Sequence, residues 1–159
     1  SLFYTGRVEE AISYAEDRLR IMKNYLTMDS YGFVLLNSGR YAEAIKIFQE
    51  IFEIEDQRYP RILGWLGASY AHSDQKDEAL AILQELQNRK AISSAGSTAF
   101  FTAVVCSALG ETADALHWLR IAIDDHEMEI PWLISEPQFF NLHDHPVFKA
   151  LVEEVGFPS

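Results

Sequence analysis

The stretch NSGRYAEAIKIFQEIF, residues 37–52, contains the pattern that decides the fold. A turn glycine, Gly39, is followed five residues later by Ala44, and apolar residues then recur three and four positions apart through Phe48 and Phe52. This spacing places the apolar side chains on one face of a helix. The glycine before the helix can adopt positive φ and end a preceding helix. The stretch therefore predicts a helix–turn–helix unit with one apolar face.

The same pattern occurs four times along the chain. The turn position is held by Gly6, Gly39, Asp74 and Gly110, at steps of 33, 35 and 36 residues. The position five residues later is held by Ala11, Ala44, Ala79 and Ala115. A side chain as small as alanine lets two antiparallel helices approach closely, and a fixed period of this length is typical of stacked helical hairpins. One hairpin cannot bury its own apolar face, so the units must stack to be stable.

The rest of the composition agrees with an all-α protein. The prolines are Pro60, Pro131, Pro137, Pro146 and Pro158. Because proline interrupts helix interiors, the two long stretches without it permit long helices. No segment shows the sustained alternation of a strand. With 159 residues, of which 48% are hydrophobic, the chain can bury a sizeable core and does not have the composition of a disordered protein.

Charge and cysteine content exclude several function classes. A net charge of −11 repels phosphate backbones and anionic lipids, so we expect no nucleic acid and no membrane surface as a partner. A single cysteine excludes an intramolecular disulfide framework and the usual zinc fingers. No secretory leader is visible, and we expect a cytoplasmic location. Acidic runs are expected on a solvated convex surface, for example Asp124, Asp125, Glu127 and Glu129.

The repeated pattern of a small residue, an aromatic residue, a turn glycine and an alanine resembles the tetratricopeptide repeat (TPR) family. The resemblance gives a single domain with a partial repeat at 1–24, full repeats at 25–58, 60–93 and 96–129, and a capping tail at 130–159. It implies an all-α fold, a right-handed α–α superhelix of stacked antiparallel helix hairpins closed by a C-terminal capping helix. The tail, with its elements Pro137–Phe139 and Pro146–Phe148, resembles the end of the TPR region in bacterial signalling and regulatory proteins.

In this family the first helix of each hairpin lines a concave groove that holds a peptide. Matching the repeat columns gives the expected peptide- or protein-binding residues as Phe33, Leu36, Asn37, Arg61, Trp65, Ser69, His72, Phe100, Phe101 and Val104. The aromatic residues among them could instead pack in the core. If they bind a partner, Phe33, Trp65 and Phe100 are expected to be partly exposed on the concave side. Arg61 is the only strongly basic residue among these positions, which disfavours a clamp for an acidic peptide and favours an apolar or basic segment.

The resemblance implies a non-catalytic scaffold that binds a protein or peptide in its groove. The alternative is a regulatory, sensory or self-association segment of a larger signalling protein such as a kinase, a cyclase or a transcription regulator, because the chain begins inside a repeat. In that case an apolar N-terminal face is expected to form a homodimer, through Leu2, Phe3, Val8 and Ile12.

Few residues suggest chemistry. The sequence His143-Asp144-His145 resembles a metal-binding cluster, but its place before Pro146 suits a helix cap formed by Asp144 or His145. Cys106 falls in a packing column, and His117 has no visible partner. Neither a phosphate-binding glycine loop nor a Gly-x-Ser-x-Gly motif occurs. We therefore expect no enzymatic activity, no metal and no cofactor.

Overall fold

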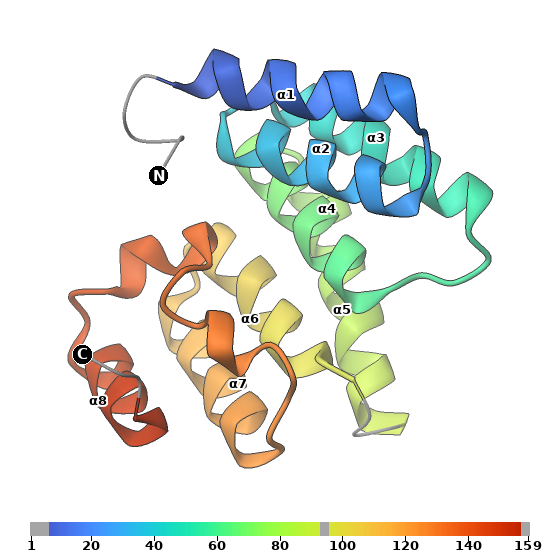
Figure 1. Ribbon diagram of the computed structural model, residues 1–159. Coiled ribbons are helices and arrows are strands. Elements are labelled where there is room, and N and C mark those ends of the chain that lie inside the picture. The colour runs from blue at the N-terminus through green and yellow to red at the C-terminus, as the bar shows by residue number, and fades with distance from the viewer. Residues whose placement is uncertain (1–6, 93–95, 157–159) are drawn as a thin grey trace.

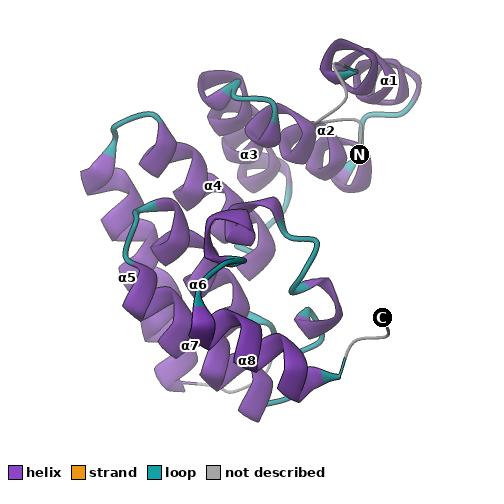
Figure 2. Ribbon diagram, turned by 90° about the vertical axis from the view of Figure 1, so that its left-hand side faces the viewer, coloured by secondary structure: helices purple, strands orange, loops and turns teal. Residues whose placement is uncertain are grey.

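A computed structural model describes residues 7–92 and 96–156, and over these ranges the protein is all-helical, with no strand (Figures 1 and 2). The α-helices are α1 (Val8–Ile21), α2 (Tyr25–Asn37), α3 (Tyr41–Ile54), α4 (Pro60–His72), α5 (Lys76–Ile92), α6 (Thr98–Ala108), α7 (Thr112–Asp124) and α8 (Pro146–Val155). Two short 3-10 helices, η1 (Ile130–Trp132) and η2 (Pro137–Leu142), lie between α7 and α8. The predicted fold class is confirmed.

The helices form a stack in which each helix packs mainly on its neighbours in sequence. Helices α2 and α3, α4 and α5, and α6 and α7 form the hairpins, while α3 packs on α4 and α5 on α6 (Figure 1). The first helices of the hairpins also contact one another, α2 with α4 and α4 with α6. They therefore share one side of the stack. Helices α2, α4 and α6 begin at Tyr25, Pro60 and Thr98, and the division of the chain into repeats stays our proposal.

In the three full repeats the small residues of the pattern have the roles that the sequence predicts, and Gly6 lies outside the described residues. Gly39 and Gly110 have φ of 81° and 79°, and Asp74 adopts the same left-handed region with φ of 60°. The three alanines of the full repeats, Ala44, Ala79 and Ala115, are fully buried. On the facing helix α2, a Cβ added to Gly32 would overlap the ring of Phe48, so the helices approach too closely there for a larger residue.

The N-terminal helix α1 buries one apolar side against α2. Ala11, Ile12 and Ala15 are buried, and α1 packs on α2. The expectation of an apolar N-terminal face is therefore wrong at Ile12, since this side chain already lies in the contact with α2. Val8 is half-buried, and Leu2 and Phe3 lie outside the described residues.

The tail closes the stack in two ways. Helix α8 packs on α7 as the predicted cap, while η2 packs on α6, on the side of the first helices (Figure 2). The η2 side chain Phe139 is fully buried, with its ring 5.3 Å from that of Phe100 and 6.4 Å from that of Phe148. The tail therefore covers the end of the stack and also part of the predicted groove.

Glu127, in the turn after α7, is buried rather than solvated, and this part of the acidic-surface prediction is wrong. Its carboxylate accepts hydrogen bonds from the backbone N–H groups of Ala99 and Phe100 at the start of α6 and from Lys90. A carboxylate at a helix N-terminus satisfies donors that have no partner within the helix. Within residues 7–92 and 96–156, none of the helices has the length and apolar character that crossing a membrane requires.

Candidate functional site

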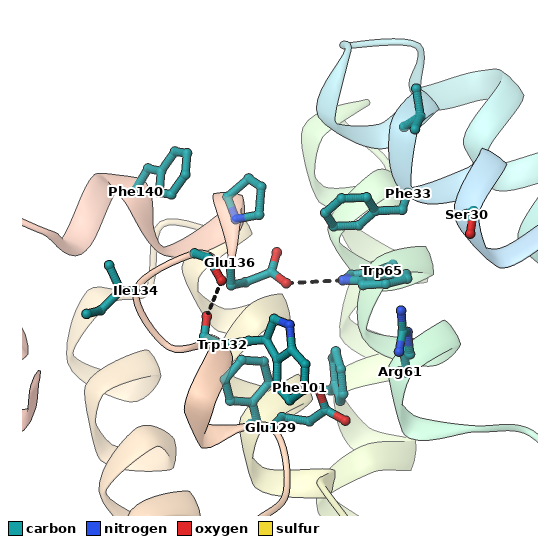
Figure 3. A pocket seen from close by; sticks show the side chains of 14 residues that line it. Ser30, Phe33, Arg61, Trp65, Phe101, Glu129, Trp132, Ile134, Glu136 and Phe140 are labelled. Atoms are coloured by element: carbon teal, nitrogen blue, oxygen red, sulfur yellow. Dashed lines mark hydrogen bonds between the residues drawn. The ribbon is translucent and has the colours of Figure 1, made fainter. Parts of the chain in front are cut away.

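A pocket of about 670 Å³ lies between the first helices of the hairpins and the tail (Figure 3). Helices α2, α4 and α6 contribute Ser30, Phe33, Val34, Arg61, Trp65, Phe100 and Phe101. The residue before the tail, Glu129, also lines the pocket, and the tail contributes Trp132, Ile134, Ser135, Glu136, Pro137 and Phe140. The pocket opens to solvent along the tail, where Trp132, Ile134 and Phe140 are exposed. We call these three residues the rim.

Aromatic rings form the inner wall of the pocket. The ring of Trp65 lies 4.8 Å from that of Phe33 and 6.1 Å, edge to face, from that of Phe101. Arg61 stands one helical turn before Trp65 on α4, and its guanidinium lies 4.7 Å from the centre of the Trp65 ring. The wall therefore presents apolar surface and aromatic faces.

Arg61 is the cation of the pocket, and it is already paired. Its Nη2 lies 3.2 Å from Oδ2 of the buried Asp29 on α2, and Glu129 lies near enough to interact with it electrostatically. Burial raises the pKa of Asp29 to about 6 although Arg61 opposes this, and Asp29 Oδ1 has no hydrogen-bond partner within the described chain. Burial also raises the pKa of Glu129. Two carboxyl groups, those of Asp29 and Glu129, therefore lie around the single positive charge of Arg61.

Glu136 is the buried carboxyl group that lines the pocket. Its residue is only 6% exposed, and its Oε2 accepts a long hydrogen bond of 3.5 Å from the indole N–H of Trp65 (Figure 3). Its Oε1 accepts a hydrogen bond of 3.2 Å from the backbone N–H of Gln138. Burial raises the pKa of Glu136 to about 7, because few groups replace the water that an ionised carboxylate needs.

The other half of the predicted groove holds the protein's own tail. The side chain of Gln138 donates to Oδ1 of Asn37 at 3.1 Å, and its Oε1 lies 2.7 Å from Nε2 of His72. Ser107 donates to the carbonyl oxygen of Gln138 at 2.6 Å. The polar residues of this half thus bind η2, in the place that the resemblance assigns to a peptide.

The structure divides the ten predicted site residues into three groups. The pocket is lined by Phe33, Arg61, Trp65, Phe100 and Phe101. A second cavity, beside η2, is lined by Leu36, Asn37 and His72. Buried within the helix stack are Ser69 and Val104. Whether any of them binds a partner stays a prediction.

The expected partial exposure is wrong for two of the aromatic residues. Trp65 is 4% exposed and Phe100 is 1% exposed, whereas Phe33 is half-buried. Phe100 packs against Phe139 of η2, and Trp65 lies between Phe33 and Phe101. The tail and the neighbouring rings therefore cover the faces of Trp65 and Phe100 that the resemblance predicts to be exposed to solvent.

Most of the pocket residues missed by the sequence analysis follow α7, and two lie on α2: Glu129, Trp132, Ile134, Ser135, Glu136, Pro137 and Phe140 after α7, and Ser30 and Val34 on α2. Column matching reaches only the repeats, and the tail is not a repeat. The available signal was the number of apolar and aromatic residues between α7 and α8, which is more than an exposed loop can hold without burying them against something.

The residues considered for chemistry have structural surroundings. His145 caps α8, where its Nδ1 accepts a hydrogen bond of 3.1 Å from the N–H of Val147, so the capping interpretation is confirmed. His143 stacks on Phe148 at 5.1 Å. Cys106 is buried, and burial raises the pKa of its thiol to about 12. In the described part of the chain, His, Cys, Asp and Glu residues form no group of three placed to hold a metal ion.

Comparison with known proteins gives one match. Residues 35–94, which run from the end of α2 through α5, match a family model described as tetratricopeptide repeat. Neither the curated proteins nor the solved structures give a match. The matched segment, the turn and alanine columns and the all-helical stack of hairpins agree with one another. Residues 35–94 therefore match the tetratricopeptide repeat family, and the all-helical stack is consistent with a helical repeat solenoid of that type.

Proposed function

We propose that this protein is a non-catalytic interaction module whose pocket binds a segment of a partner protein. Tetratricopeptide repeats generally mediate protein–protein interaction. The observation that carries the proposal is the rim, where Trp132 is 56% exposed beside Ile134 and Phe140 at the mouth of an aromatic cavity. Single exposed apolar residues are ordinary, but several around one cavity are typical of a binding site.

The charges of the pocket favour an apolar or basic segment over an acidic one. Arg61 is held by Asp29, while Glu129 and Glu136 line the same cavity. An acidic peptide would bring further carboxylates against these two groups without a free cation to receive them. A nucleic acid backbone would meet the same repulsion from a chain with a net charge of −11. A cytoplasmic location and a bacterial signalling setting belong to this proposal as well, from the composition and the resemblance of the tail.

The rim gives a direct test of the proposed function. Dodecapeptides displayed on phage are selected on the unmodified protein, and their dissociation constants are measured by fluorescence anisotropy. The double substitution Trp132→Ala and Phe140→Ala should weaken the selected peptides at least tenfold, because central aromatic anchors carry most of the energy of such interfaces. Leu80→Ala, at an exposed apolar position on α5, is the matched control and should leave the affinity unchanged.

Equal affinity for the rim variant and the unmodified protein would rule out this pocket as the binding site. The rim is preferable to Trp65 or Phe100 for this purpose, because truncating a buried aromatic residue costs stability by itself and would confuse the result.

Self-association is a second candidate function, favoured by the outer surface of the first helix. Helix α1 packs on α2, and four large apolar residues in or beside these helices are exposed: Tyr14, Ile21, Met22 and Leu26. If this surface forms a homodimer, sedimentation equilibrium at micromolar concentrations should give twice the monomer mass of 18.1 kDa. The double variant Ile21→Lys and Met22→Lys should then sediment as a monomer. A monomeric unmodified protein would remove this candidate.

A further inference from the structure

The geometry points to a cationic side chain, lysine or arginine, as the group of the partner segment that enters the pocket, with its charged end at the carboxyl group of Glu136 and its stem along the aromatic wall. This inference rests on the proposed function and specifies the chemistry of the partner. It depends on three features of the pocket: an under-bonded buried acid, aromatic faces beside it, and an excess of negative charge around it.

The acid has capacity for another donor. The carboxyl group of Glu136 points across the pocket toward Trp65, and its two hydrogen bonds measure 3.5 and 3.2 Å (Figure 3). The 3.5 Å bond is long for N–H···O and the 3.2 Å bond is at the upper end of the usual range, and a carboxylate has about four acceptor positions. An ammonium or guanidinium group would supply short, charge-assisted hydrogen bonds to the unfilled positions.

The walls suit the rest of such a side chain. Lysine and arginine carry their charge on apolar stems that pack well against aromatic surface. The rings of Phe33, Trp65 and Phe101 provide that surface, and Trp132 stands at the mouth. One cation already uses a face of this wall, because the guanidinium of Arg61 lies 4.7 Å from the centre of the Trp65 ring.

The charges that face Glu136 favour a cation over an anion. Arg61 on α4 is the positive group among them, and its ion pair with Asp29 on α2 offsets its charge. Glu129 adds a second carboxyl group on the tail side. Burial raises the pKa of Glu136 to about 7, so the groups that line the pocket stabilise its ionised form poorly. An incoming cation would supply the stabilisation that is missing.

Small probes test the charge preference without any partner protein. The probes are n-butylguanidinium and n-butylammonium, with n-butanol as the neutral analogue and butyrate as the anionic one. Binding is followed at pH 8 through the indole ¹⁵N–¹H signal of Trp65, which donates to Glu136. Both cations should bind at least tenfold more tightly than butanol. Glu136→Gln should weaken the cations about tenfold to a hundredfold and leave butanol unchanged.

Glu78→Gln, which removes an exposed carboxylate on α5, is the matched control and should change nothing. Circular dichroism confirms that each variant is folded. The inference is overturned by equal binding of butanol and the cations, by tighter binding of butyrate, by cation binding that ignores Glu136→Gln, or by no binding of any probe.

The outcomes separate this inference from the proposed function. Selected peptides that need the rim but contain no enriched lysine or arginine would leave the interaction module in place and overturn the cation preference. Cation probes that bind through Glu136 while no displayed peptide binds would support the cation site and overturn the peptide-binding proposal.

Discussion

Replacing Glu127 with alanine should lower the free energy of unfolding by about 3–5 kcal/mol, the range found when one partner of a buried charge pair is removed. The Glu127 side chain is 1% exposed, and its ion-pair partner Lys90 is 9% exposed, with Nζ 2.8 Å from Oε2. Alanine would leave this ammonium with Asp125, whose side chain is far more exposed, as its remaining partner. Asp125 lies 2.6 Å from the ammonium and would keep part of the pairing, but losing the more deeply buried of its two carboxylate partners is costly.

The same substitution removes the N-terminal cap of α6. Ser97 precedes this helix but makes no capping bond with its side chain. The carboxylate of Glu127, which follows α7, instead accepts hydrogen bonds from the backbone N–H groups of Ala99 at 3.0 Å and Phe100 at 2.8 Å. Two buried backbone donors would lose their partners together with the ion pair, and each loss adds to the cost.

Urea denaturation at neutral pH, followed by circular dichroism, measures this effect. Glu127→Gln should give a smaller loss than alanine, because the amide oxygen still accepts a hydrogen bond although the charge is gone. Glu154→Ala is the control, since it breaks an exposed ion pair with Arg120 and should cost far less than Glu127→Ala. A Glu127→Ala protein as stable as this control would show that the buried pair contributes nothing.

Replacing Glu136 with glutamine should have the opposite sign and raise the free energy of unfolding by about 1–3 kcal/mol at pH 8. The pKa of Glu136 is raised from 4.5 to about 7 in the folded protein, first by burial, while Gln138, Trp65 and Arg61 oppose the rise. A pKa difference of this size corresponds to about 3 kcal/mol once both the folded and unfolded states are ionised. Glutamine stays neutral and avoids this cost while keeping one oxygen for the N–H of Gln138.

The pH dependence follows from the direction of the shift. The folded protein holds the Glu136 proton more tightly than the unfolded chain, so stability is lost as pH rises from about 4.5 through about 7. The gap between Glu136→Gln and the unmodified protein should grow by about 2 kcal/mol between pH 5.5 and pH 8. Asp29, whose pKa is also raised by burial, changes stability in the same direction in both proteins and cancels in the difference.

Urea denaturation of both proteins at the two pH values measures that gap. A gap that stays constant, or that closes as pH rises, would mean that Glu136 is ionised in the folded protein at little cost. Glu127→Gln in the same experiment should be destabilising at pH 8, which separates the two buried carboxyl groups by sign.

Glu127 and Glu136 are both buried, but their surroundings give them different roles. Glu127 meets an ammonium group and two backbone N–H groups at 3.0 Å or less, as a structural carboxylate requires. Glu136 accepts only two hydrogen bonds, of 3.5 and 3.2 Å, and lines an open pocket. Binding sites often contain residues that lower the stability of the folded protein. A buried carboxyl group such as that of Glu136, which costs stability, is therefore consistent with a role in binding.

The sequence by itself determined the repeated hairpins. Positive φ occurs at the turn residues Gly39, Asp74 and Gly110, and the alanines five positions later allow close helix contact. Each of these two features follows from the residue type alone. The spacing of apolar residues three and four positions apart indicated which face of each helix is buried. These features need only neighbours within one repeat, so the all-helical stack and the column positions could be read from the chain.

The tertiary structure decided the site. The path of residues 129–142 depends on packing Phe139 against Phe100 and on the hydrogen bond from Gln138 to Asn37, a residue 101 positions away in the sequence. No repeat column encodes such contacts. The tail therefore covers half of the groove, brings Glu136 to Trp65 and leaves a pocket where the repeats alone predict an open channel, because burial and charge balance depend on the whole folded chain.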